Sequence, residues 1–503
     1  MPVDTITLPR DSNQALGLGR FALDFLNGKL GAPGELARRD VERFHLDSVA
    51  CAVSALALRT NAPNVLRDEA LEYRVADGQP GASCFGSHTR VQPEKAIAAN
   101  CAAAREWDSN GTNFGYNPRL GHTAGEFGHN DFYPVVVAAA QQVSIDGDRA
   151  ALAMLLLDEI RGRLAEVFSL KDHKIDHVVH GAIASAAVYG ALLGATPEQI
   201  ESAIGLLVAH YIPFRAIRAG KQLSDSKGAS AALSTEMAIV SIRRALRGFV
   251  GPADIFRNPE AIFCLFEPPK AKQESPFDLT FAVAGDDFAV RGMHFKLGLY
   301  EHQSAGAIQG LIDLLQRHPA LLADEAKIEK LRIRIYQPAF GIIGDPAKRD
   351  PRTRQSADHS MVYIVATLLR KALTLRAVGW KELMLMPADY ADAALVDPLT
   401  RRLIDRIEFA HGGPEFDAKY PDGIPTSLEI EHTDLGRLSS GLVMYPAGHA
   451  RYPGDDLEQL LSHKFQLLAS LGVVDPKSLY ERCHRLRGKS PEAMAELYEF
   501  EIK

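Results

Sequence analysis

Two adjoining stretches, "AIASAAVYGALLG" (182–194) and "ATPEQIESAIGLLVAHY" (195–211), decide the fold class of this chain. The first is rich in small residues, which let helix backbones approach closely in a crowded core. In the second, Thr196 can cap a helix, Pro197 suits the first helical position and Gln199 completes a capping box. Together they predict two closely packed helices inside a helical domain.

The helical pattern extends over the first 250 residues. The stretch "DSNQALGLGRFALDFLNGKL" (11–30) offers Asp11 and Ser12 as candidate caps and then places apolar residues on one helix face. Two further stretches, at 46–58 and 148–168, are apolar nearly all round, as buried helices are. We therefore expect this half of the chain to form a large helical domain.

The spacing of apolar residues changes from about residue 285. "KIEKLRIRIYQ" (327–337) alternates as a half-buried strand does, and "TSLEIEHTDLGRLSSGLVMYP" (426–446) predicts a hairpin whose turn includes Gly436. Between them "DPLTRRLIDRIEF" (397–409) predicts a helix, and helices return after about residue 456. We expect a mostly α protein with a smaller α+β domain, divided into a helical domain (1–285), an α+β lid domain (286–447) and C-terminal helices that complete the helical domain (448–503).

The composition limits the cellular compartment and the kinds of partner that we expect for this protein. With 503 residues, 46% of them hydrophobic, the chain can bury a large core, yet no apolar run reaches the roughly 18 residues of a membrane span. Its beginning, "MPVDTITLPRD", has the layout of neither a signal peptide nor a transit peptide. Five scattered cysteines without a CxxC pair argue against disulfides, zinc and iron–sulfur clusters, and a net charge of −7 argues against nucleic acid. We expect a cytoplasmic protein.

Two Glu-x-x-His pairs raise the question of a metal site. Glu429 and His432 lie on the expected strand, where they do not share a helix face. Glu126 and His129, together with His122, have the spacing of a one-face helical site. Three glycines interrupt them, and each costs about 1 kcal/mol relative to alanine in a helix. The sequence therefore predicts no metal site, and it lacks the glycine-rich phosphate loops and the GxSxG elbow of other enzyme classes.

The stretch "EWDSNGTNFGYNPRLGHTAGEFGHND" (106–131) interrupts the helical pattern with five glycines and many polar side chains. Further ionisable or hydroxyl groups follow it in apolar or small-residue surroundings. Taken singly, each has a plain structural explanation, such as a helix cap, a hydrogen-bonded core histidine or a solvated lysine. The candidate functional residues are, in chain order, Asp108, His129, His177, Lys227, Lys296, His302, Tyr363 and His449.

The order and context of these residues resemble the MmgE/PrpD family, which includes 2-methylcitrate dehydratases, cis-aconitate decarboxylase and iminodisuccinate epimerase. The resemblance runs from about residue 15 to 500 and is most specific in "DHVVHGAIASAAVYGALLGATPEQI" (176–200) and "YPAGHARYPGDDLEQLLSHKF" (445–465). Shorter matches are "NCAAAREWDSN", "GEFGHND", "HFKLGLYEHQS" and "DHSMVYIVA". The resemblance implies a mostly helical domain with a small α+β lid, a site in the cleft between them, a homodimer and no cofactor.

The first matches lie in the polar stretch. Asp108 matches the aspartate of the family's "D-x-N-D" segment, and His129 matches the histidine of its "GHPSD" segment. His177 takes the place of the histidine that precedes the small-residue helix. Two departures stand beside these matches: the second aspartate is Gly111 here, and about ten extra residues (114–123) fill the loop. Both departures lie where the substrate would bind.

Two lysines complete the family's pattern. Lys296 takes the place of a lysine ahead of a helix that begins with histidine. Lys227 takes the place of a lysine before a Gly-Ala helix, and Lys221 is a rival match. In the family, a proline and a cysteine usually follow the lysine that Lys296 matches. Here "LGLYE" (297–301) stands in their place. A substrate like 2-methylcitrate carries three carboxylates, so these lysines would supply positive charge locally on an acidic protein.

The resemblance implies the elimination of water from a small di- or tricarboxylate. A histidine can remove the proton next to a carboxylate or protonate the departing hydroxyl near neutral pH. Arg105 or Arg218 would assist in pairing carboxylates, and Asp108 would orient a histidine. The implied catalytic residues are His129, His177, Lys296 and Asp108, and the implied substrate-binding residues are Lys227, Arg105, Tyr363, His302 and His449.

Three alternatives stay open at this point. The same scaffold could carry a decarboxylase of the cis-aconitate type or an epimerase of the iminodisuccinate type. A third alternative is a carboxylate-binding protein without catalysis. All of them share an acidic ligand and a pocket of histidine and lysine side chains, so the sequence does not separate them.

Overall fold

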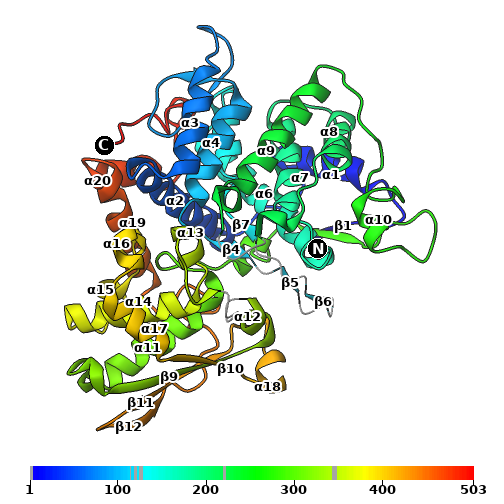
Figure 1. Ribbon diagram of the computed structural model, residues 1–503. Helices are drawn as coiled ribbons and strands as arrows, with labels where there is room; N and C mark the ends of the chain where they lie inside the picture. The colour runs from blue at the N-terminus through cyan, green and yellow to red at the C-terminus, as the bar shows by residue number, and fades with distance from the viewer. Residues whose placement is uncertain are drawn as a thin grey trace.

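The computed structural model describes all residues except 1–3, 114, 118–119, 121, 124–127, 219–222 and 343–347. It is mostly α-helical with a smaller α+β part, as the sequence predicts (Figure 1). The helical part contains α1 (Gln14–Leu26), α2 (Glu35–Ala57), α3 (Asn61–Glu72), α4 (Pro93–Arg105), α5 (Pro134–Ala140), α6 (Gly147–Val167), α7 (Val178–Leu192), α8 (Pro197–His210), α9 (Asp225–Leu246) and α10 (Ile262–Phe266). Its short strands pair as β1 (Thr5–Leu8) with β8 (Leu279–Ala282), β2 (Ala82–Ser83) with β3 (Arg90–Val91), β4 (Thr112–Asn113) with β7 (Gly128–His129), and β5 (Tyr116–Asn117) with β6 (His122–Thr123).

Helices α4, α7 and α8 all pack against α9. Every residue of α7 is buried, and a Cβ placed at Gly181 would meet the ring of Phe132 at 2.0 Å. The small residues of α7 are therefore needed for close packing. Helix α8 begins with the predicted capping box, in which Thr196 and Gln199 each accept a hydrogen bond from the other's backbone N–H. The two helices expected from the opening stretch are confirmed.

Helix α1 begins at a different cap from the predicted one. Its N-cap is Asn13, whose side chain accepts a hydrogen bond from the backbone N–H of Leu16 at 3.1 Å. The Ser12 hydroxyl instead donates to the carbonyl of Pro9 at 2.6 Å, within the turn before the helix. The prediction of Asp11 or Ser12 as the cap is therefore wrong, because the preceding turn uses Ser12.

A four-stranded sheet in the order β10–β9–β11–β12 organises the α+β part. β9 (Ile328–Ile335) pairs in parallel with β10 (Ile407–His411) and antiparallel with β11 (Thr426–His432), and β11 turns into β12 (Gly436–Ser439). The predicted strand and hairpin are confirmed, but Gly436 begins β12 opposite His432 and does not lie in the turn. The helix predicted at 397–409 ends early, because its last residues join the sheet as β10. The helices of this part are α11 (Ala305–Arg317), α12 (Gln337–Ile342), α13 (Arg354–Ala357), α14 (Met361–Leu375), α15 (Trp380–Leu383), α16 (Asp392–Leu395), α17 (Pro398–Asp405) and α18 (Pro414–Asp417).

The end of the chain returns to the helical part. α19 (Leu457–Gly472) and α20 (Pro476–Cys483) both contact α2 (Figure 1), and α21 (Pro491–Ala495) packs on α5. The domain boundaries expected at residues 285 and 447 stay a prediction. Within the part of the chain that the structure describes, no helix is long and apolar enough to cross a membrane.

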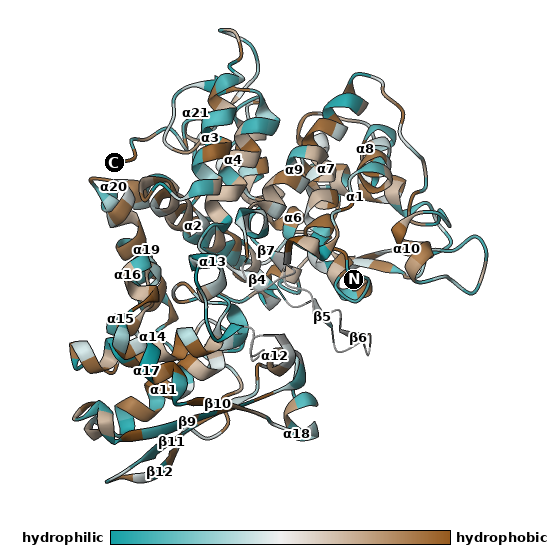
Figure 2. Ribbon diagram, in the orientation of Figure 1, coloured by the Kyte–Doolittle hydropathy of each residue, from teal (hydrophilic) through white to brown (hydrophobic). Residues whose placement is uncertain are grey.

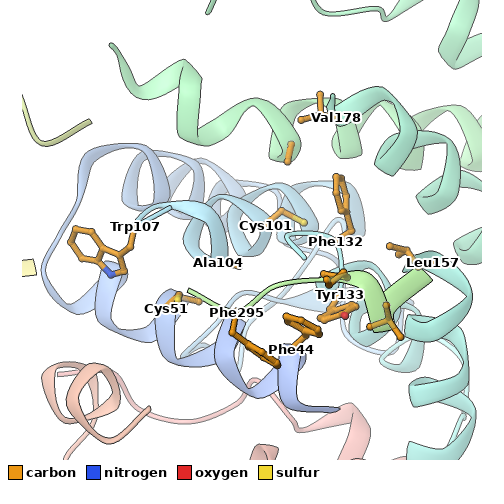
Figure 3. Close-up of a cluster of buried hydrophobic side chains, with 14 of the residues drawn as sticks. Phe44, Cys51, Cys101, Ala104, Trp107, Phe132, Tyr133, Leu157, Val178 and Phe295 are labelled. Carbon is orange, nitrogen blue, oxygen red and sulfur yellow. The ribbon is translucent and has the colours of Figure 1, made fainter. Parts of the chain in front are cut away.

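Apolar side chains fix two of the segments that carry candidate residues. Hydrophobic residues run through the helices and the sheet of both parts (Figure 2). Phe44 of α2 stacks on Phe295, with ring centroids 3.9 Å apart and an interplanar angle of 11°, and Trp107 is buried in the same cluster (Figure 3). Phe295 directly precedes Lys296, and Trp107 directly precedes Asp108. Core packing therefore holds the backbone beside both candidates.

Candidate active site

The polar stretch 106–131 brings Asp108 and His129 to the end of α4. That helix ends at Arg105, and Asp108 then takes a φ of 52°, in the left-handed region that few residues other than glycine adopt. The chain continues into β4, which pairs with β7 so that Thr112 lies opposite His129. The short β4–β7 pair therefore folds the loop back and sets His129 beside Asp108.

Three buried cations surround the Asp108 carboxylate. Arg105 forms an ion pair with Oδ1. Lys296 Nζ donates to the same oxygen at 3.0 Å and to the Asp108 carbonyl at 2.6 Å. Lys227 Nζ lies 3.8 Å from Oδ2. We call these four residues, Asp108, Arg105, Lys227 and Lys296, the charged cluster. Two carboxylates outside it also pair with its cations, Asp131 with Arg105 at 3.6 Å and Asp358 with Lys227 at 3.4 Å, whereas Lys296 forms an ion pair with Asp108 alone among the described residues.

His129 and His177 lie together at the edge of the charged cluster. Their ring centroids are 5.5 Å apart. Arg105 Nη2 donates to His129 Nε2 at 3.1 Å, whereas the Asp108 Oδ1 atom is 3.9 Å away from that nitrogen, beyond hydrogen-bond distance. His177 Nδ1 lies 3.4 Å from the carboxylate of Asp176. Two imidazoles from separate segments, β7 and the start of α7, therefore face each other.

The structure adds Asp358 and His359, which the sequence analysis missed. His359 Nε2 lies 3.4 Å from Asp108 Oδ2, and its Nδ1 lies 2.5 Å from Asp358 Oδ1. Lys227 Nζ donates to Asp358 at 3.4 Å and lies 3.2 Å from His359 Nδ1. Both residues belong to "DHSMVYIVA" (358–366), so the motif was visible while its first two residues were overlooked. The α+β part thus contributes directly to the site.

Burial and nearby charges together set the pKa values of the site. Burial alone would raise the pKa of Asp108, but Arg105, Lys227 and Lys296 outweigh it and hold that pKa well below its usual range. Burial lowers the pKa of Lys296, and it lowers the pKa of Lys227 to about 8. Burial, with Arg105 and Lys296 nearby, also holds the pKa of His129 well below its usual range. The ligand-free site therefore combines an ionised carboxylate with a neutral His129.

Two further carboxyl groups near the site titrate close to neutral pH. Burial raises the pKa of Glu301 to about 7, against the opposing charge of Lys296. Burial also raises the pKa of Glu106 to about 6, although Arg354 lies 2.5 Å from its carboxylate. Neither residue carries a recognisable sequence signal, because their pKa values depend on how the chain buries them.

His302 and His449 meet in a separate group. His294, which the sequence analysis did not select, stacks between them, with ring centroids 4.9 Å from His302 and 4.2 Å from His449. We call these three residues the imidazole stack. Burial lowers the pKa of all three, to about 4 for His449, and nearby Lys296 contributes to lowering that of His302. The stack therefore adjoins the charged cluster through His302.

Other predicted site residues are not placed in the charged cluster. The Tyr363 hydroxyl donates to the Asp389 carbonyl at 2.8 Å, inside the α+β part. Lys221 lies outside the described residues, as do the Arg218 side chain and much of the extra loop at 114–123. Lys227 is thus the lysine of the two that the structure shows at Asp108.

One group of potential metal ligands occurs among the described residues. Asp108, Asp358 and His359 place ligand atoms within 4.8 Å of one another. Lys227 lies 3.8 Å and 3.4 Å from the two carboxylates, and two further cations contact Asp108, so a divalent ion there would meet strong repulsion. Glu126 and the His122 side chain, from the other possible metal group, lie outside the described residues.

The geometry defines a class of site: a buried, cation-rich centre with two facing imidazoles, built where a helical part meets an α+β part. The MmgE/PrpD N-terminal domain matches residues 27–274, and the MmgE/PrpD C-terminal domain matches residues 300–479. The chain therefore belongs to the MmgE/PrpD family.

Several relatives carry the same printed name. The chain is 27% identical over 415 residues to the 2-methylcitrate dehydratase of Salmonella typhi, covering 77% of each chain. It is 27% identical over 322 residues to that of Escherichia coli (strain K12), covering 63% of this chain and 62% of the relative. The mitochondrial 2-methylcitrate dehydratase of Yarrowia lipolytica is 25% identical over 355 residues, covering 65% and 64%.

Proposed function

We propose that this protein is a hydro-lyase that eliminates water from a small tricarboxylate, with 2-methylcitrate as the first candidate substrate. The observation that carries the proposal is the charged cluster beside His129 and His177. Buried cations attract a polyanion, and two imidazoles can move the protons of a dehydration. The names of the relatives support the same reaction.

The two histidines differ in their surroundings, which suggests separate roles. Asp176 lies 3.4 Å from His177 Nδ1 and would orient its imidazole, so we assign His177 as the base that takes a proton from the substrate. His129 Nε2 accepts from Arg105 in this structure. A bound carboxylate would draw Arg105 away and add negative charge, and both changes raise the pKa of His129. His129 would then give a proton to the departing hydroxyl.

The lysines would bind carboxylates and stabilise the charge that develops on them. Lys296 and Lys227 approach Asp108 from two different segments, so a ligand entering beside Asp108 would meet both ammonium groups. Cations that are already in place when charge develops lower the barrier without further rearrangement. We expect Lys227→Ala mainly to raise KM, and Lys296→Ala to change both kcat and KM.

A substrate panel tests the proposal. Purified protein is incubated with 2-methylcitrate, citrate, cis-aconitate and iminodisuccinate, while alkene absorbance, carbon dioxide release and optical rotation are followed. We expect alkene formation from 2-methylcitrate. Carbon dioxide from cis-aconitate would instead assign the decarboxylase alternative, and racemisation of iminodisuccinate the epimerase. Binding without turnover on the whole panel would leave the non-catalytic alternative.

The proposal also covers the compartment, the oligomeric state and the cofactor requirement of the protein. We propose a cytoplasmic homodimer that acts without a cofactor, a membrane or nucleic acid, in line with what the family resemblance implies. Light scattering of the purified protein at several concentrations measures the oligomeric state. A monomer at all concentrations would remove the dimer from the proposal without affecting the reaction.

A further inference from the structure

Lys464 lies in the C-terminal helix α19, and its side chain is fully buried beneath the candidate active site. It has 0% of its side chain exposed, and its partner Asp47, on α2, has 6%. Lys464 Nζ donates to Asp47 Oδ1 at 2.7 Å and to the backbone carbonyl of Ser109 at 2.6 Å. One ammonium group therefore joins α19, α2 and the residue that follows Asp108.

The Ser109 carbonyl follows a residue with an unusual backbone conformation. Asp108 has a φ of 52°, in the left-handed region that most residues with a Cβ avoid and that aspartate adopts more readily than most. Lys296 Nζ holds the Asp108 carbonyl at 2.6 Å and Lys464 Nζ holds the Ser109 carbonyl at 2.6 Å. The Ser109 hydroxyl also donates to the Gly298 carbonyl at 2.6 Å. Two consecutive carbonyls thus each accept a hydrogen bond from a buried ammonium.

Stability alone is a poor explanation for the Lys464–Asp47 pair. Replacing a buried ion pair by apolar residues of similar volume is often neutral or stabilising, because both charges lose their hydration on burial. The pair is also incompletely satisfied: within the described part of the chain, Asp47 Oδ2 has no hydrogen-bond partner. What the pair provides, and an apolar pair would not, is a donor aimed at the backbone next to Asp108.

We propose that Lys464 and Asp47 are positioning residues, which hold the Ser109 carbonyl so that Asp108 and Lys296 keep their places in the active site. The inference rests on the proposed function for its kinetic consequence. Asp47 orients the ammonium group, and Lys464 fixes the carbonyl. The C-terminal helix α19, which contributes no side chain to the charged cluster, thereby becomes necessary for the geometry of that cluster.

The decisive comparison is between Lys464→Met and the double variant Asp47→Leu/Lys464→Met. The single variant leaves Asp47 buried without its cation, so its Tm should fall. The double variant replaces the pair by apolar groups, so its Tm should return toward that of the wild type. Neither variant can hold Ser109, and a displacement of about 1 Å can cost up to about a hundredfold in rate. We expect kcat to fall at least about tenfold in both, with KM changed much less.

Lys95→Met is the matched control. Lys95 is a partly buried lysine in the first turn of α4, paired with Glu69 and Glu236, and about 15 Å along the helix from Arg105. The Tm of the Lys95→Met variant should fall, and its kcat should stay at the wild-type value. Recovery of kcat together with Tm in the double variant would overturn the proposal. So would an unchanged kcat in Lys464→Met, which decides the matter if the double variant does not fold.

A crystal structure separates this inference from the proposed function. If the wild type turns over no substrate of the panel, the proposed function fails, and the kinetic comparison cannot be made. The backbone can still be compared, because the inference requires Asp108 to leave its positive φ, or Lys296 to lose its bond to the Asp108 carbonyl, in the Lys464→Met variant. Unchanged positions of both groups would overturn the inference on their own.

Discussion

The charged cluster and the imidazole stack are buried to a similar degree, yet they differ in ionisation. Asp108, Lys296 and His302 are all about 1% exposed. In the cluster, opposite charges lie within a few ångströms of each other and hold Asp108 ionised. In the stack, three imidazoles face one another without a nearby carboxylate that outweighs burial, and all three have lowered pKa values. The comparison shows that burial favours the neutral form of a group unless opposite charges lie close enough to outweigh it.

The two regions also influence each other. Lys296 of the cluster contributes to lowering the pKa of His302 in the stack. While its rings are neutral, the stack adds no charge beside Lys296. A protonated stack would place further positive charge next to that lysine.

Asp108→Asn should have the largest combined effect, because it should lower both stability and kcat. It removes the negative charge that Arg105, Lys227 and Lys296 share, and removing one partner of a buried ion pair typically costs about 3–5 kcal/mol of stability. We expect kcat to fall by more than about 10²-fold. Denaturant unfolding and steady-state kinetics measure both effects. Asp158→Asn is the matched control, since Asp158 also pairs with an arginine three residues away and should lose stability only.

His177→Ala and His129→Ala should each lower kcat by about 10²–10⁴-fold with little change of fold, because each removes a proton-transfer group. Steady-state kinetics on variants with wild-type melting curves measure the effect. His180→Ala is the control on the same helix: its imidazole is buried and bonds to the Phe168 carbonyl at 3.0 Å. If both active-site variants kept more than about a tenth of wild-type kcat, the acid–base assignment would be wrong.

The imidazole stack should make the protein sensitive to acid. Its histidines have folded-state pKa values below the unfolded value of about 6.5, so below pH 6.5 the unfolded chain binds more protons. Their full contribution to stability is present above pH 6.5 and is lost as the pH falls toward about 4, by up to about 1.4 kcal/mol per pH unit for each group. Urea unfolding from pH 7.5 to 5 measures the slope. A flat profile would contradict the neutral state of the stack.

His449→Phe should have a smaller effect at neutral pH than the changes above. A phenyl ring can keep the stacking on His294, but it removes the acceptor for the backbone N–H of Arg451 at 3.0 Å, a loss of about 1–3 kcal/mol of stability. It should also reduce the acid slope of the previous experiment, because one buried titrating group is gone. Activity should stay near that of the wild type, and a large loss of kcat would place His449 in the reaction after all.

Dialysis against a strong chelator should have no effect on turnover. Lys227 and two other cations already compensate the carboxylates of Asp108 and Asp358. Activity measured before and after dialysis, with each divalent ion added back, checks this. A loss that a single metal ion restores would assign a metal to Asp108, Asp358 and His359 instead.

Local patterns allowed much of the scaffold to be predicted. The capping box of α8, the buried length of α7 and the alternation of β9 all depend on neighbours within a few residues, so the sequence displays them directly. The end of α17 was missed because its following residues pair with β9, far away in the chain, and that pairing overrides the local helical pattern.

The candidate site likewise combines features that the sequence predicts with features that depend on contacts between distant segments. By itself, the sequence determined which residues to examine, including Asp108, His129, His177 and Lys296, because they keep the order of a known family. Only the tertiary structure decided their charges and partners. It placed Arg105 between Asp108 and His129, and it added groups such as Asp358, His359 and Lys464 from distant segments. The physical reason is that electrostatic interactions and burial depend on distance in space, whereas a sequence displays only distance along the chain.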